Sequence, residues 1–197
     1  MAGRGTTLHT VTTRRVLYSV VCGAAPAAYV DRLVIAARER GWAVQVIATA
    51  TACEHFVDLA ALERLLGEPV RTGYRRADES RPPADAVIVA PATYNTINKW
   101  ANGISDTYVL SLLAELTGLG TPIVVLPFVN TALAANPVFT RSVTELRTGG
   151  VTVLFGPDVA EPHPPRTAET RIDAYPWQLA LDALEPPSGQ PAGPAAA

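Results

Sequence analysis

Residues 86–106 of the chain read AVIVAPATYNTINKWANGISD, and this stretch decides the fold. The apolar run Ala86–Ala90 predicts a buried strand, and Pro91 then turns the chain into small and hydroxyl-bearing residues that lead into a helix. In an α/β protein, ligands bind at the carboxyl ends of the strands. The stretch therefore predicts a strand-to-helix unit with a ligand site at its turn.

The rest of the chain alternates between strand and helix patterns. Short apolar runs predict strands, and apolar residues at helical spacing predict helices. The expected strands are 16–22, 43–48, 85–90, 123–126 and 151–154, and the expected helices are 27–40, 59–66, one from about 93, 107–116, 137–147 and 176–184. Continuous apolar strands separated by helices predict parallel strands covered on both faces. The predicted fold class is α/β, a doubly wound and mainly parallel sheet with helices on both faces.

Length and composition limit the classes of protein that the chain can belong to. Its 197 residues suit one domain with a substantial core, and 48% hydrophobic and 17% charged residues are typical of a soluble globular protein. A net charge of −2 gives no general attraction to nucleic acid. No apolar run approaches the length that crosses a membrane, and Met1–Thr13 lacks the apolar core of a secretory signal. Cys22 and Cys53 cannot form a disulfide framework or a zinc-ligand spacing, so we expect a cytoplasmic protein without a metal site.

The two ends of the chain differ in composition from the rest. Residues 1–13 are rich in Gly and Thr, and residues 186–197 are rich in Pro, Ala and Gly, with no hydrophobic pattern in either segment. Such segments cannot bury enough apolar surface to fold. We therefore expect disordered tails at 1–13 and 186–197 around a single domain at 14–185.

Three loops follow the first three expected strands and meet at one edge of the sheet: Gly23–Ala27, Thr49–Ala52 and Pro91–Thr96. Gly23 allows the backbone to approach a ligand, and Pro26 suits the first turn of a helix because proline has no N–H. Thr49 and Thr51 can cap a helix or bind phosphate oxygens, and capping is the stronger expectation for either one alone. The first loop lacks the second and third glycines of the dinucleotide fingerprint, and no P-loop sequence occurs, so NAD and P-loop nucleotide hydrolysis are disfavoured.

Five ordered motifs resemble those of the homo-oligomeric flavin-containing cysteine decarboxylases. They are a Gly-Ser-type loop, a Thr-x-Ser-Ala-x-x-Phe pattern, the PASANT motif, Ala-Asn-Gly-x-x-Asp and Pro-x-Met-Asn-x-x-Met-Trp-x-Asn-Pro, matched in turn by Gly23–Ala24, Thr49–Phe56, Pro91–Thr96, Ala101–Asp106 and, partly, Pro127–Pro137. Their order and spacing hold from about Arg15 to Gly156. Among the members, Asn95–Lys99 resembles most the peptidyl-cysteine decarboxylases of lanthipeptide-type biosynthesis.

The resemblance implies a Rossmann-like flavoprotein sandwich that binds FMN and assembles as a homo-oligomer, a trimer or a dodecamer, on a small-molecule or peptide substrate. It implies no nucleic-acid or membrane partner. By this resemblance, the residues near the phosphate and ribityl chain are Gly23, Ala24, Thr49 and Thr51, and those near the flavin or the substrate are Ala92, Thr93, Asn95 and Thr96. Asp106 would support the same pocket. Asn95 and Asn130 are the expected catalytic residues, because they would position the substrate.

The chain departs from the family's pattern in the catalytic surroundings. Ala77 occupies the position of the family's essential histidine. Of the three histidines present, His9 lies in a tail, His163 lies among prolines, and a structural or solvated role is the stronger expectation for His55. The family's Met and Met-Trp are replaced by Val129 and Leu133–Ala134.

Two functional hypotheses follow. The first is an FMN-dependent cysteine decarboxylase that converts a C-terminal peptidyl cysteine oxidatively to an enethiol. Phosphopantothenoylcysteine is disfavoured as its substrate, because residues 157–170 lack the Cys-Gly motif of the coenzyme A branch. The second is a non-decarboxylating FMN oxidoreductase or regulatory flavoprotein, which the alanine at position 77 favours. A flavin prenyltransferase matches Pro91–Thr96 less well, and an α/β domain without a cofactor is the remaining alternative.

Overall fold

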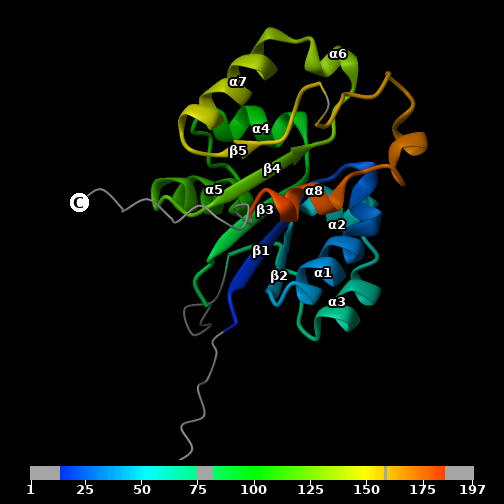
Figure 1. Ribbon diagram of the computed structural model, residues 1–197, viewed down its shortest axis with the longest axis vertical. Helices are drawn as coiled ribbons and strands as arrows, with labels where there is room; N and C mark the ends of the chain where they lie inside the picture. The colour runs from blue at the N-terminus through cyan, green and yellow to red at the C-terminus, as the bar shows by residue number, and fades with distance from the viewer. Residues whose placement is uncertain (1–13, 75–81, 158, 185–197) are drawn as a thin grey trace, which may run out of the picture.

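The computed structural model describes residues 14–74, 82–157 and 159–184, which fold around one central sheet (Figure 1). Its five strands are all parallel and lie in the order β2-β1-β3-β4-β5. Their bounds are β1 Val16–Val21, β2 Ala43–Ala48, β3 Ala86–Ala92, β4 Ile123–Pro127 and β5 Thr152–Val153. The predicted doubly wound parallel sheet is therefore confirmed.

Helices connect successive strands. The α-helices are α1 Val30–Glu39, α2 Ala50–His55, α3 Leu59–Leu66, α4 Tyr94–Ala101, α5 Tyr108–Gly118, α6 Thr131–Ala134, α7 Pro137–Thr148 and α8 Trp177–Asp182, and the 3-10 helices are η1 Ala25–Tyr29 and η2 Ala168–Arg171. Within the described part of the chain, none of these helices has the length and apolar character needed to span a membrane.

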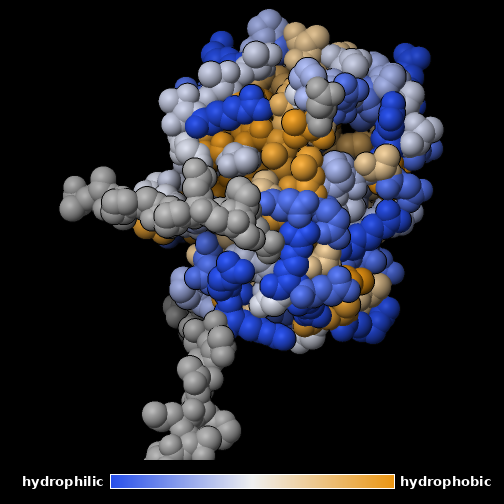
Figure 2. All heavy atoms as spheres, viewed as in Figure 1, coloured by the Kyte–Doolittle hydropathy of each residue, from blue (hydrophilic) through white to orange (hydrophobic). Residues whose placement is uncertain are grey.

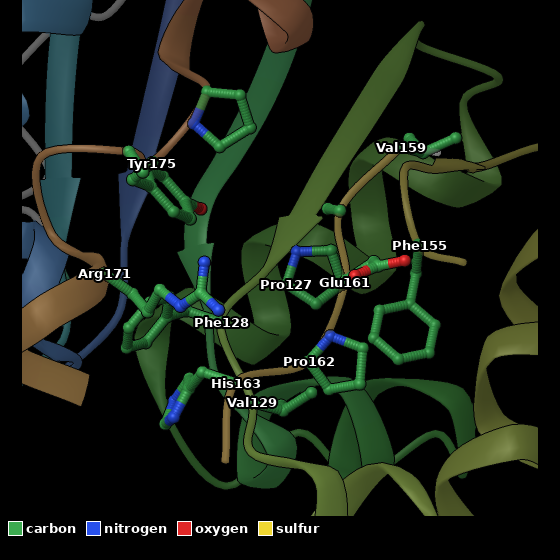
Figure 3. A pocket seen from close by; sticks show the side chains of 13 residues that line it. Pro127, Phe128, Val129, Phe155, Val159, Glu161, Pro162, His163, Arg171 and Tyr175 are labelled. Atoms are coloured by element: carbon green, nitrogen blue, oxygen red, sulfur yellow. The ribbon is translucent and has the colours of Figure 1, made fainter. Parts of the chain in front are cut away.

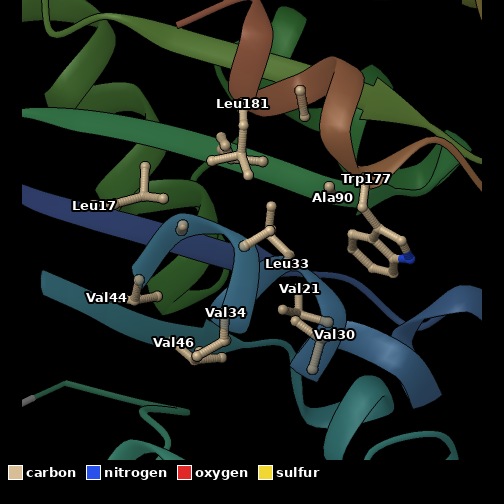
Figure 4. Close-up of a cluster of buried hydrophobic side chains, with 14 of the residues drawn as sticks. Leu17, Val21, Val30, Leu33, Val34, Val44, Val46, Ala90, Trp177 and Leu181 are labelled. Carbon is tan, nitrogen blue, oxygen red and sulfur yellow. The ribbon is translucent and has the colours of Figure 1, made fainter. Parts of the chain in front are cut away.

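The sheet has a hydrophobic core on each face, because successive side chains of a strand point to opposite sides. In β1, Leu17 and Val21 pack against the layer that contains α1, α3 and α8, as the close-up in Figure 4 shows. Tyr18 and Val20 pack on the other face, against α4, α5 and α7. All six residues of β1 are buried, which explains why its sequence is a continuous apolar run rather than an alternating one.

The observed elements differ from the predicted ones at a few places. The expected helix at 27–40 is divided into η1 and α1, with Pro26 in the first turn of η1 as predicted. The expected loop at 49–52 ends at Thr49, because Ala50–His55 is helical. The sequence did not predict α6 and η2, which have four residues each and are too short to show a helical period. The predicted tails at 1–13 and 186–197, and Ala77, lie outside the described residues.

Candidate functional site

The strand order places a crevice between β1 and β3, because the chain leaves these two neighbouring strands toward opposite faces of the sheet. Backbone hydrogen bonds join the carboxyl ends of four strands there. The donor and acceptor pairs are Cys22 N to Pro91 O (3.1 Å), Thr49 N to Val21 O (2.9 Å) and Phe128 N to Ala92 O (2.9 Å). We call the residues 23–24, 49–51 and 92–96 at these ends the carboxyl edge. It contains all the predicted cofactor residues except Asp106.

The first two loops of the carboxyl edge touch each other at Gly23 and Thr51. A Cβ atom on Gly23 would lie 2.6 Å from Cγ2 of Thr51, so the position does not accept a side chain without movement. Thr49 caps α2, since its hydroxyl accepts a hydrogen bond from Ala52 N at 3.3 Å, which is the role expected for this threonine alone. Thr51 is exposed at the rim, and Ala24 is half-buried. The glycine thus brings the two loops together and leaves the Thr51 side chain at the surface.

The third loop directs its two threonines inward. Thr93 caps α4 by accepting a hydrogen bond from Thr96 N at 3.3 Å, and the hydroxyls of Thr93 and Thr96 are 3.0 Å apart. Thr96 is buried and hydrogen-bonds to the Cys22 thiol, whose pKa is raised by burial. Asn95, in contrast, is exposed. Asn95 is therefore the exposed polar side chain of this loop, while Thr96 secures the loop to β1.

Asp106 lies apart from the carboxyl edge within this chain. It follows the C-terminal end of α4, an eight-residue helix about 12 Å long whose N-terminus is at the edge. Its carboxylate forms an ion pair with Lys99 at 2.5 Å, and both side chains are partly exposed. The structure does not bring Asp106 together with the other predicted site residues, and its predicted support of the pocket stays a prediction.

The composition of the carboxyl edge suits FMN. Its residues are small or carry neutral hydroxyl and amide groups, which can donate to phosphate and ribityl oxygens without opposing their charge. Lys99 on α4 and Asp106, which follows that helix, neutralise each other in an ion pair.

A cavity of about 250 Å³ adjoins the carboxyl edge at the end of β4 (Figure 3). It forms because residues 155–157 and 159–177, which we call the C-terminal cover, return over Pro127–Val129. Tyr175 secures the cover, since its buried hydroxyl donates a hydrogen bond to Leu126 O at 2.6 Å. Figure 2 shows a hollow at this place, beside an apolar area that hydrophilic residues surround. Glu161 and Arg171 bring opposite charges to the cavity wall.

The backbones of Asn130, which follows β4, and of His163, in the C-terminal cover, pair in an isolated parallel β-bridge. His163 N donates to Val129 O at 3.2 Å, and Thr131 N donates to His163 O at 2.8 Å. The side chain of Asn130 caps α6 by accepting from Leu133 N at 2.9 Å.

His163 is the residue of this site that the sequence did not reveal. Its side chain is buried and its ring lies 4.6 Å from that of Phe128, centroid to centroid. Prolines on both sides give the segment no periodic pattern, and it is the bridge to Asn130 and the position in the cavity wall that bring His163 to this place. His55 is instead largely exposed beside Glu54, in agreement with the solvated role expected for it.

The family described as Flavoprotein matches residues 6–173 of the chain. Among curated proteins, a coenzyme A biosynthesis bifunctional protein of Thermococcus kodakarensis is 35% identical over 98 residues, which cover 46% of this chain and 24% of that protein. The corresponding protein of Mycobacterium tuberculosis is 36% identical over 118 residues, which cover 56% of this chain and 27% of that protein. The chain thus spans less than a third of the length of these relatives.

Solved structures share the fold over more of the chain. An FMN-dependent cysteine decarboxylase from thioviridamide biosynthesis has a TM-score of 0.63 and 25% identity, covering 87% of this chain and 99% of its own. A mutant PPC decarboxylase complexed with pantothenoylaminoethenethiol has a TM-score of 0.59 and 21% identity, covering 72% and 81% of the two chains. The second likeness shows the fold alone. The first extends over nearly the whole of a cysteine decarboxylase.

Proposed function

The chain belongs to the flavoprotein family, and we propose that it is an FMN-dependent decarboxylase of substrates that end in a cysteine. One observation carries the proposal. The carboxyl edge, which suits FMN, is joined by the Phe128 N to Ala92 O hydrogen bond to the segment that holds Asn130 and the cavity. A cofactor site and a substrate-sized space therefore adjoin, as the 25% identical cysteine decarboxylase leads us to expect.

The loops of the carboxyl edge would hold FMN. The backbone of Gly23 and Ala24 and the hydroxyl of Thr51 are available at the rim, while Thr49 shapes the second loop by capping α2. Ala92 and Thr93 form the third wall, with Asn95 exposed beside them. When bound, FMN supplies a two-electron oxidant, which is the part of the chemistry that no protein side chain can supply.

The proposed reaction balances with FMN as the only oxidant. A peptide R–NH–CH(COO⁻)–CH₂–SH, one proton and FMN give R–NH–CH=CH–SH, CO₂ and reduced FMN. The carbon bearing sulfur loses two electrons, and the bond to the carboxylate breaks with its electron pair entering the new C=C bond. The protein must hold the carboxylate, orient the thiol and exclude water, and the adjoining cavity provides the enclosed space.

Asn130 and Asn95 would position the substrate. The side-chain oxygen of Asn130 is occupied by Leu133 N, so its orientation is fixed and its amide N–H groups are available to a carboxylate. Asn95 adds an exposed amide at the start of α4. Both groups are neutral donors, so they bind a carboxylate without holding it as firmly as an arginine would, and CO₂ can leave.

A non-decarboxylating flavoprotein is the second candidate. The observation that favours it is Ala134, which stands where the resembling family has tryptophan. A site without this aromatic side chain has lost apolar contact with a substrate. In this candidate, FMN is bound and reduced, but the cysteine carboxylate is not released.

The test begins with flavin absorption of the purified protein and continues with a cysteine-terminated peptide under anaerobic conditions. We expect bleaching of the flavin and a peptide that has lost CO₂ and two hydrogens. The same peptide ending in serine, or in cysteine amide, should give neither change. A protein that binds FMN but releases no CO₂ from a panel of such peptides favours the second candidate, and a protein that binds no FMN contradicts both.

Asn130→Asp tests the substrate site with a matched control. Aspartate also caps a helix, so α6 should persist, but its carboxylate repels the carboxylate of the substrate. We expect the kcat/KM for the cysteine peptide to fall about 100-fold, the size of a lost hydrogen bond to a charged group together with the repulsion. Asn136→Asp makes the same change at the cap of α7 and should leave kcat/KM within about twofold. Equal effects of the two variants would contradict the role given to Asn130.

A further inference from the structure

His163 has the features of a proton acceptor. Its Nδ1 lies 2.9 Å from Pro164 O. A carbonyl oxygen can only accept, so Nδ1 carries the hydrogen in the neutral ring and Nε2 keeps its lone pair. A backbone carbonyl that fixes one nitrogen of an imidazole in this way leaves the other nitrogen free to take a proton. The contacts thus select the tautomer that a general base needs.

The ring of His163 is held at the junction of the cavity and the carboxyl edge. It stacks on Phe128, whose backbone N donates to Ala92 O in the third loop. In Figure 3, the His163 ring lies beyond the end of β3, on the side of Phe128, and turns away from the centre of the cavity. The two backbone bonds to Val129 and Thr131 fix the residue from both sides. The backbone of His163 is therefore paired with that of Asn130, and its ring lies beyond the carboxyl end of β3, the strand that leads into the third loop.

We propose that His163 is the catalytic residue that takes the proton of the substrate thiol and returns it to the product. This inference rests on the proposed function. The S–H bond breaks, its proton moves to Nε2 and its electron pair stays on sulfur, where it supports the loss of electrons from the adjacent carbon. After CO₂ has left, the electron pair on the enethiolate sulfur takes the same proton back from Nε2. The cycle leaves His163 neutral and needs no further reactant.

The charged and titratable groups that line the cavity together with His163 leave this role to the imidazole. Among the described residues that line the cavity, Glu161 and Arg171 are the charged ones, and Tyr175 is the other titratable one. Burial raises the pKa of Tyr175 well above its ordinary value, and its hydroxyl already donates to Leu126 O, so it stays neutral. Carboxylates and guanidinium groups keep their charge near pH 7 in exposed settings, whereas imidazoles titrate there.

His163→Asn separates proton transfer from structure. The amide nitrogen of asparagine can replace Nδ1 as a donor to Pro164 O, but the side chain has no group that exchanges a proton near neutrality. We expect turnover of the cysteine peptide to fall by about 10²–10⁴-fold, with FMN affinity and melting temperature nearly unchanged. The wild-type rate should have an acidic limb in its pH profile, and this limb should be absent from the residual rate of the variant. His55→Asn, the same change at an exposed histidine, should retain turnover and the acidic limb.

Imidazole NMR of the FMN-loaded protein gives a readout that does not depend on turnover. The His163 signal is assigned from its loss in the variant. With the flavin reduced beforehand, the cysteine peptide should shift this signal toward the imidazolium form at pH 7, and the serine peptide should not. A wild-type chain that turns over cysteine peptides while His163→Asn keeps the rate and the acidic limb overturns the role of His163 alone. A chain that binds FMN but neither binds nor converts any cysteine peptide overturns the proposed function and this role together.

Discussion

The carboxyl edge and the C-terminal cover meet at one site but are built in different ways. The edge consists of three strand-to-helix turns, in which Thr49 and Thr93 cap the helices that directly follow them. The cover consists of irregular chain held by contacts between distant residues, such as Tyr175 with Leu126, 49 positions apart. Helix caps shape the turns of the edge and backbone hydrogen bonds between neighbouring strands join them, whereas side-chain contacts between distant residues hold the cover. The turns of the edge can therefore be recognised from short sequence motifs, and the position of the cover cannot.

Removing the Tyr175 side chain tests the dependence of the cover on tertiary packing. Tyr175 is buried between Phe128 and Trp177, with ring centroids 5.8 and 4.7 Å away. We expect Tyr175→Ala to lower the free energy of unfolding by about 3–5 kcal/mol, the range for truncating a large buried aromatic residue. The FMN affinity of the folded fraction should change much less. Urea unfolding and flavin titration measure the two quantities, and an equal loss of both would show that edge and cover are one unit.

Tyr175→Phe isolates the hydrogen bond to Leu126 O. It keeps the ring but leaves a buried carbonyl unpaired, so we expect a loss of about 1–3 kcal/mol. Burial raises the pKa of the Tyr175 hydroxyl, so in the folded state it stays protonated after its unfolded counterpart has ionised. The contribution of the hydroxyl to the free energy of unfolding is therefore complete below about pH 10. Above that pH it declines by about 1.4 kcal/mol per pH unit. The difference in unfolding free energy between wild type and Tyr175→Phe should shrink above pH 10, and a constant difference contradicts this account.

Replacing Gly23 tests the contact that joins the first two loops of the carboxyl edge. A Cβ at this position would lie 2.6 Å from Cγ2 and 2.9 Å from Cβ of Thr51. We expect Gly23→Ala to cost about 1–3 kcal/mol of stability, as overpacking does, and to weaken FMN binding because the loops move apart. The second change, Thr51→Ser, removes the nearest methyl group and should restore part of the stability. Additive losses in the double variant would show that Gly23 is needed for another reason.

The same contrast explains what could be predicted from the sequence. The strand β2 and the helix α3 were predicted with their observed bounds. The first is a short, mostly apolar run, and the second has apolar residues at helical spacing and ends at Gly67. The turns of the carboxyl edge were predicted only in part, because Pro91, the expected turn, lies within β3, which continues to Ala92, and α2 already begins at Ala50. The cavity and the place of His163 could not be predicted, because their positions depend on which strand the cover crosses. No periodic pattern in the sequence predicts that the backbone of His163 pairs with that of Asn130.

Thr93 and Asp58 form a matched pair of helix caps, one inside the carboxyl edge and one outside it. Thr93 accepts from Thr96 N and Asp58 accepts from Ala61 N. We expect Thr93→Ala and Asp58→Ala each to lower stability by about 1 kcal/mol. Only Thr93→Ala should also weaken FMN binding, because the third loop then loses its shape. Thr93→Ser retains the cap and should retain both properties, and an effect of Asp58→Ala on FMN affinity would argue against a local cause.

The ion pair of Lys99 and Asp106 is the place where motif and geometry disagree. The motif groups Asp106 with the cofactor residues, but within the chain its carboxylate pairs with Lys99 at the far end of α4. Because both side chains are partly exposed, either substitution by alanine should cost only about 0.2–1 kcal/mol. If Asp106 serves the flavin pocket of a second copy of the chain, Asp106→Ala should weaken FMN binding in the assembled state, and Lys99→Ala should not. If the pair has only a structural role, the two variants should have equal and small effects on stability and none on FMN affinity. Flavin titration of the two variants at matched oligomeric state decides between these results. It thereby shows whether the carboxyl edge of one chain binds FMN without a residue from a second copy.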